Sequence, residues 1–141
     1  MQYTTMKMLV LYILKEFASE GEAVIRMESF HKALASAFES LTHSGFVMSD
    51  AGVEKNGRWH SFERELNQAR MKNLVFGDQF MNPFERHAYL YAGTCENARR
   101  EINSQRVESH DERTALENAA EACYITYHNL VQTRSRFKIA G

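Results

Sequence analysis

Apolar residues recur every three or four positions over most of the chain, which is the spacing of one face of an α-helix. The first such stripe covers residues 5–18 and is interrupted by the polar residues 19–22 (SEGE). A second stripe begins at Val24 and ends at Ser44-Gly45, where glycine suits the left-handed residue that closes a helix. The pattern therefore predicts N-terminal helices over residues 5–18 and 24–43.

The segment 46–60 breaks this pattern because it is rich in turn-forming residues. Its Asn56-Gly57 dipeptide favours a two-residue β-hairpin turn of the primed type. The sequence leaves two structures open here: a small β-hairpin with arms near residues 53–55 and 58–60, or an ordered loop. A third helix is predicted over residues 61–76, ending before Gly77-Asp78.

The C-terminal part of the chain carries two matched helix patterns. Each starts with residues typical of a helix N-terminus, Asn82-Pro83-Phe84-Glu85 in one case and Ser109-His110-Asp111-Glu112 in the other. Apolar and small residues then follow in steps of four and three, namely Phe84, Ala88, Tyr91, Cys95, Ala98 and Ile102, and later Leu116, Ala120, Cys123, Tyr127 and Leu130.

A short connection between two helices makes them antiparallel neighbours. We therefore predict an antiparallel helical hairpin formed by residues 83–107 and 110–134. In this hairpin Cys95 lies beside Cys123, and Ala98 packs opposite Leu116 and Ala119.

Length and composition agree with one globular domain. The chain has 141 residues, a net charge of −1, seven glycines and one proline, which excludes collagen-like and low-complexity classes. No repeat and no linker divides it. The prediction is an all-α single domain over residues 1–141, with about five helices and with residues 1–80 packed on the hairpin of residues 82–136.

The longest apolar run, residues 8–14 (MLVLYIL), is too short to span a bilayer and lacks a following signal-cleavage site. We interpret it as a buried helix, with no membrane association. Cys95 and Cys123 match neither a redox pair nor a zinc-binding pair. A cytoplasmic protein with two reduced thiols is expected.

The histidines do not occur at the spacing of a common metal motif. The best metal fragment is Glu28-x-x-His31, of the type that di-iron helical proteins use twice, and the chain has no second copy. One such pair is about what chance would place in this composition. The sequence therefore predicts no metal and no cofactor.

Arg26 and His31 also form an R-x4-H motif, which resembles the short active-site motif of the HEPN ribonucleases, all-helical proteins that cut RNA at a dimer interface. The resemblance covers six residues. It implies that Arg26 and His31 act on the scissile phosphate and its 2′-hydroxyl. Here, however, the motif lies on the second predicted helix, whereas the family usually carries it near the end of the domain.

A helix that ends near Gly45, followed by a turn-rich segment with Lys55, Arg58 and Trp59, is similar to the recognition helix and wing of winged-helix regulators. This resemblance implies a DNA-binding regulator in which these three residues contact nucleic acid and the C-terminal hairpin forms a dimer. Acidic residues on the second helix and the balanced charge argue against it. It is the alternative function.

Three apolar or aromatic residues fall off the predicted helix seams: Trp59, Tyr89 and Leu90. Residues of this kind anchor protein interfaces. With no nucleophile motif and no phosphate-binding loop in the sequence, the chain is expected not to be an enzyme. The leading hypothesis is a regulator, adaptor or inhibitor, of a type common among phage and mobile-element proteins, that docks on a larger protein. A dimer is compatible with this hypothesis.

Overall fold

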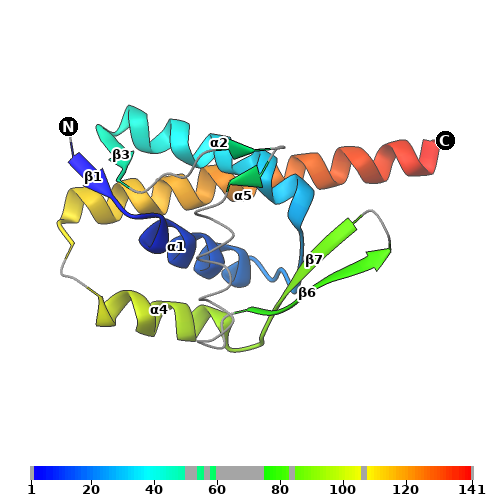
Figure 1. Ribbon diagram of the computed structural model, residues 1–141, viewed down its shortest axis with the longest axis horizontal. Helices are drawn as coiled ribbons and strands as arrows, with labels where there is room; N and C mark the ends of the chain where they lie inside the picture. The colour runs from blue at the N-terminus through cyan, green and yellow to red at the C-terminus, as the bar shows by residue number, and fades with distance from the viewer. Residues whose placement is uncertain are drawn as a thin grey trace.

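The computed structural model describes residues 2–49, 54–55, 58–59, 75–82, 85–105 and 108–140. The protein is mostly helical, with three small sheets, so the predicted all-α class holds for the bulk of the chain. The described residues form four helices, α1 (Met6–Ser19), α2 (Met27–His43), α4 (Thr94–Ser104) and α5 (His110–Ala140) (Figure 1). Among the described residues, no helix is long and apolar enough to cross a membrane.

Helix α1 is apolar on nearly every side and lies between other helices (Figure 1). Residues 8–14 are all buried, as predicted. Such a helix is stable only where neighbouring elements cover it, and α1 packs against both α4 and α5. Its start is capped by Thr5, whose Oγ1 accepts a hydrogen bond from the backbone N–H of Met8 at 3.3 Å.

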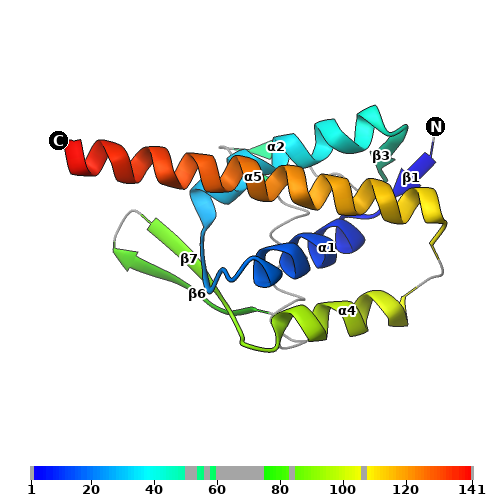
Figure 2. The same ribbon diagram turned by 180° about the vertical axis from the view of Figure 1, so that it is seen from behind.

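Helices α2 and α5 lie side by side in antiparallel directions and form the most extensive helix contact (Figures 1 and 2). The Oγ atom of Ser36 and the Oγ1 atom of Thr126 share a hydrogen bond of 2.7 Å across this contact. Helix α2 ends before Gly45, which has a φ of +83°, so the predicted glycine termination is confirmed.

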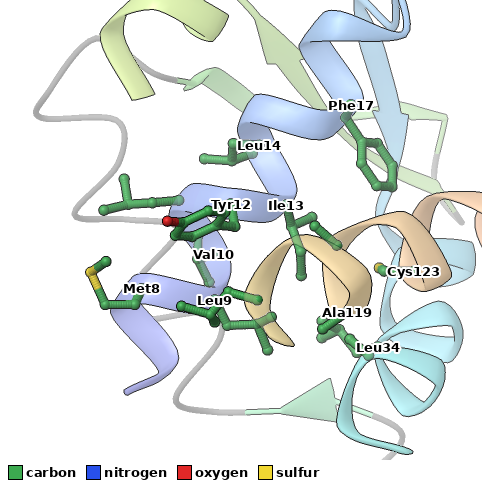
Figure 3. Packing of buried hydrophobic residues seen from close by; sticks show 14 of the residues in the cluster. Met8, Leu9, Val10, Tyr12, Ile13, Leu14, Phe17, Leu34, Ala119 and Cys123 are labelled. Carbon is green, nitrogen blue, oxygen red and sulfur yellow. The ribbon is translucent and has the colours of Figure 1, made fainter. Parts of the chain in front are cut away.

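The hydrophobic core lies where α1, α2 and α5 meet (Figure 3). Phe17 of α1 lies at its centre and is fully buried. Its ring centroid is 5.0–5.1 Å from those of three rings on α2 and α5, in tilted or edge-on geometries that favour aromatic contact: Phe30, Tyr124 and Tyr127.

The strands form three small sheets. Strand β1 (Gln2–Thr4) pairs in parallel with β3 (Phe46–Met48), which joins the chain start to the segment after α2. Strands β4 (Glu54–Lys55) and β5 (Arg58–Trp59) form an antiparallel pair. The third sheet is antiparallel and has the order β2-β7-β6, with β2 (Val24–Arg26), β6 (Val75–Asn82) and β7 (Glu85–Leu90).

The predicted C-terminal helical hairpin is wrong in its first half. Residues 85–90 form the central strand β7, and among the described residues of the predicted helix 83–107 only 94–104 are helical. The Asn82-Pro83 dipeptide, interpreted as a helix cap, is also a turn signal, and here Asn82 is the last residue of β6. Hydrogen bonds to β2 and β6 on both sides of β7 replace those that a helix would make within itself.

The predicted pairing of the two C-terminal helices is also wrong. Helix α4 packs on α1, and α1 lies between α4 and α5 (Figure 1). Ala98 is fully buried but does not face Leu116 and Ala119, because its helix covers a different neighbour. Because α1 is apolar on nearly every side, it needs cover from more than one neighbour and lies between α4 and α5.

Two further boundaries differ from the prediction. The second helix begins at Met27 rather than Val24, because Val24, Ile25 and Arg26 pair with β7. Val75 and Phe76, predicted to end the third helix, begin β6; the rest of that predicted helix, residues 61–74, lies outside the described residues. The alternative of a small hairpin within residues 46–60 is confirmed by the β4–β5 pair, whose connecting Asn56-Gly57 is likewise outside them.

Candidate functional site

The residues of the metal fragment do not form a ligand cluster. Glu28 is exposed on the first turn of α2 and pairs with Lys32 at 3.9 Å, whereas the His31 side chain is buried. Among the described residues, no group of three or more His, Cys, Asp or Glu side chains could hold a metal ion.

The residues of the R-x4-H motif lie close in the chain but differ in their surroundings. Arg26 ends β2, and its backbone N–H donates a hydrogen bond to the Tyr127 hydroxyl at 2.9 Å, while its buried Nη1 atom has no hydrogen-bond partner. His31 lies on α2 and is 6% exposed. Within one chain an RNA phosphate would have little access to this imidazole.

The two cysteines are free thiols on different helices. Cys123 on α5 is fully buried, and this burial strongly raises the pKa of its thiol. Cys95 on α4 is half-buried. A buried, protonated thiol behaves as a small apolar side chain, so Cys123 has a packing role.

The residues of the DNA-binding alternative lie on the β4–β5 pair. Lys55 and Arg58 are direct cross-strand partners, and Trp59 pairs with Glu54. The antiparallel register therefore brings two basic residues together at the end of a two-stranded hairpin.

A buried carboxylate joins the α4–α5 connection to α1. The Tyr12 hydroxyl donates a short hydrogen bond to Oε1 of Glu108, whose side chain is only 5% exposed. Burial and the Glu108 carboxylate strongly raise the pKa of Tyr12. Arg113 contributes its Nε atom 3.9 Å from the same carboxylate oxygen. This cluster fixes the connection on α1 and offers no open reaction site.

Shallow hollows follow the contact between α2 and α5. One of them, about 560 Å³, is lined by Glu28, Ser29, Lys32, Thr126, Asn129, Leu130 and Thr133. A second of about 470 Å³ shares Thr126 and extends toward Ser44. Glu28 and Lys32, the charged residues that line the first hollow, form an exposed ion pair of the kind common on the solvated side of a helix.

The outer face of the β2–β7 pair carries the most distinctive exposed residues. Val24 and Tyr89 are cross-strand partners, and Tyr91 follows β7 directly. The backbone N–H of Leu90 bonds the Ala23 carbonyl at 2.9 Å, which makes Val24 and Tyr89 a pair whose side chains approach closely. Val24 and Tyr91 are each 39% exposed, and Tyr89 is half-buried. We call these three residues the outer patch.

Opposite faces of this sheet have opposite roles. Ile25 and Leu90 alternate with the outer patch and are buried in the core, so Leu90 offers little area to a partner. Tyr89 of the predicted anchors belongs to the outer patch, and the side chain of Trp59 lies outside the described residues. Val24 and Tyr91 were missed because both fell on predicted helix seams, and residues 85–90 (ERHAYL) carry no period-two alternation that would have indicated a strand.

A polar border adjoins the outer patch. Glu22, two residues before Val24, accepts a hydrogen bond from the Tyr124 hydroxyl at 3.2 Å. Burial, together with the nearby Glu22 carboxylate, raises the pKa of Tyr124 to about 12. An aromatic centre with a polar border is typical of protein interfaces.

Comparison of the chain with protein-family models, with curated proteins and with solved structures finds no match. Function must therefore be inferred from the surface and core of this molecule.

Proposed function

We propose that this protein is a non-catalytic binding protein, a regulator, adaptor or inhibitor that docks on a larger cytoplasmic protein through its outer patch. The observation that carries this proposal is the exposure of Val24, the cross-strand partner of Tyr89, together with that of Tyr91, which directly follows β7. Large exposed hydrophobic and aromatic side chains that lie together are the usual anchors of an interface. Encoding by a phage or another mobile element is part of this proposal.

The rigidity of the outer patch supports docking without a large ordering cost. Its central strand β7 is hydrogen-bonded to β2 on one side and to β6 on the other. Ile25 and Leu90, on the opposite face of the strands, are fixed in the core. A surface held in this way loses little conformational entropy when a partner binds.

The test compares two exposed positions. Tyr91→Asp is expected to reduce binding to the captured partner by at least about tenfold, because removing an interface anchor costs about 2 kcal/mol or more. Tyr3→Asp is the matched control, since Tyr3 is 60% exposed but lies on β1, outside the outer patch. Affinity capture with mass spectrometry identifies the partner, and calorimetric titration then measures each variant. Equal affinities for the two variants would contradict the proposal.

A second measurement separates docking from catalysis. A docking protein should exert its effect in stoichiometric amounts, without sensitivity to chelators, and His31→Ala should leave the effect unchanged. An RNA-cleaving enzyme built on Arg26 and His31 would instead turn over many substrates and lose this activity in His31→Ala. Multiple turnovers that disappear in this variant would replace the docking proposal.

The cross-strand pair of Lys55 and Arg58 favours one second candidate, a winged-helix-type DNA-binding regulator. Phosphate contacts by these residues would make duplex binding fall steeply with salt. Lys55→Glu combined with Arg58→Glu should then abolish it. A wild-type protein that shifts no duplex DNA at low ionic strength would exclude this candidate.

A further inference from the structure

Helix α5 has a second stripe of residues on the side opposite its buried one. The buried side holds Leu116, Ala119, Ala120, Cys123 and Tyr127. Exposed residues recur at the same three- and four-residue spacing on the other side: Thr114, Asn118, Glu121, Ile125, Asn129 and Gln132. The helical repeat places Arg136 at the next position. We call the six exposed residues the exposed stripe.

Ile125 lies at the centre of the exposed stripe and is chemically unlike its neighbours. It is 51% exposed, and among residues 110–133, the part of α5 whose side chains are described, it is the only large exposed hydrophobic residue. The other members of the stripe are polar or charged. A single exposed apolar side chain at the middle of a long polar stripe is a natural centre for a symmetric contact with a second copy of the helix.

The exposed stripe is complementary to itself in the antiparallel direction. If two copies of α5 cross so that Ile125 meets Ile125, Glu121 lies opposite Asn129 of the second copy and Asn118 lies opposite Gln132. These are apolar, carboxylate–amide and amide–amide pairs. Arg136 lies opposite Thr114, within one helical turn of Asp111 and Glu117.

The distribution of charge along α5 agrees with this direction. All of its acidic residues lie in the first half, at Asp111, Glu112, Glu117 and Glu121, and all basic residues after Arg113 lie near its end, at Arg134, Arg136 and Lys138. Antiparallel copies bring the acidic half of one helix beside the basic end of the other. Parallel copies would place like charges together and are disfavoured.

The C-terminal end of α5 extends beyond the other helices (Figures 1 and 2). When two copies of α5 lie antiparallel, the projecting C-terminal end of each helix can therefore contact the acidic half of the other. Because residue i contacts residue j while j contacts i, such an interface closes as a two-fold dimer rather than a filament.

We propose that this protein self-associates as an antiparallel two-fold dimer through the exposed stripe of α5, centred on Ile125. A single pair of helices buries less surface than a permanent dimer, so the association is weak and depends on concentration. The exposed stripe shares no residue with the outer patch.

Sedimentation of the full chain tests this proposal, at concentrations up to about 1 mM so that even a millimolar complex is detected. The apparent mass should rise from 16.3 kDa toward twice that value. Ile125→Asp should remain monomeric, because it places two carboxylates in contact at the centre. Tyr3→Asp, at a more exposed position on β1, should associate as the wild type does.

Asn129 gives a test of direction at one position. Asn129→Lys creates an ion pair with Glu121 of the second copy, twice per dimer, and should lower the dissociation constant by roughly 2- to 30-fold. Asn129→Glu should raise it by a similar factor. Both variants should melt with the wild type, since Asn129 is exposed. A monomeric wild type, or a shift of the constant in the same direction by both variants, would overturn the dimer.

Discussion

The two C-terminal segments, 85–104 and 110–140, begin from similar patterns of apolar residues and form different structures. The first is divided into the central strand β7 and the short helix α4, while the second is a single helix of 31 residues. Four members of the apolar stripe of α5 are buried, whereas in the first segment Tyr91 is exposed and Cys95 is half-buried. Equal spacing of apolar residues thus led to unequal burial.

The difference lies in the partners available to each segment. Residues 85–90 have a strand on each side, and these backbone hydrogen bonds satisfy the segment without a helix. Helix α5 instead has α1 and α2 along its buried side. A segment with a helical pattern therefore forms a helix where a continuous apolar surface lies beside it. Where a strand lies on each side, the same kind of segment forms a strand.

The largest predicted effect contrasts one stripe residue from each segment. Leu116→Ala should lower the free energy of unfolding by about 2–5 kcal/mol, because it opens a cavity at a fully buried position. Tyr91→Ala should lower it by about 1 kcal/mol or less, since this side chain is already 39% exposed. Urea unfolding measures both, and similar losses would mean that the two stripes are buried alike.

Ala98 tests which helix covers α4. Ala98→Leu should destabilise the protein by about 1–3 kcal/mol through overpacking against α1. Because α4 and α5 do not pack along each other, combining it with Leu116→Val should give the sum of the single effects within about 0.5 kcal/mol. If Leu116→Val instead relieved the overpacking caused by Ala98→Leu, the two residues would be in contact. The predicted packing of the two C-terminal helices as a hairpin would then be correct.

Each of the two stripes contains one cysteine, and the two thiols should respond differently. Cys123→Ser should cost about 1–3 kcal/mol because it buries a hydroxyl, and Cys95→Ser should cost clearly less. In the native protein, a thiol reagent near neutral pH should label Cys95 first, since burial shields the Cys123 thiol and raises its pKa. Equal labelling rates at the two thiols would contradict this difference.

The smallest predicted effect compares the two capping signals. Ser109 accepts a hydrogen bond from the backbone N–H of Glu112 at 3.1 Å, so Ser109→Ala should cost about 1 kcal/mol. Asn82 caps no helix, because it ends β6, and Asn82→Ala should lack this cap penalty. Thermal melts of the two variants make the comparison; a larger loss for Asn82→Ala would go against it.

The outer patch was only partly accessible from sequence. Tyr89 was identified as an anchor because it fell off a helix seam, although its exposure results from a strand rather than from the side of a helix. Val24 joined it only through the pairing of two segments that are far apart in the chain. Such a patch depends on register, which no local pattern of residues 22–26 or 85–91 determines.

The sequence by itself determined those features of this protein that depend on only a few neighbouring residues. Thr5 and Ser109 cap their helices, Gly45 closes α2, and the apolar run of residues 8–14 is buried, because each feature depends on nearby backbone groups or on hydrophobicity alone. The tertiary structure decided the rest. It inserted α1 between α4 and α5 and made residues 85–90 a strand, because covering a helix that is apolar on nearly every side and pairing distant backbones are properties of the whole chain.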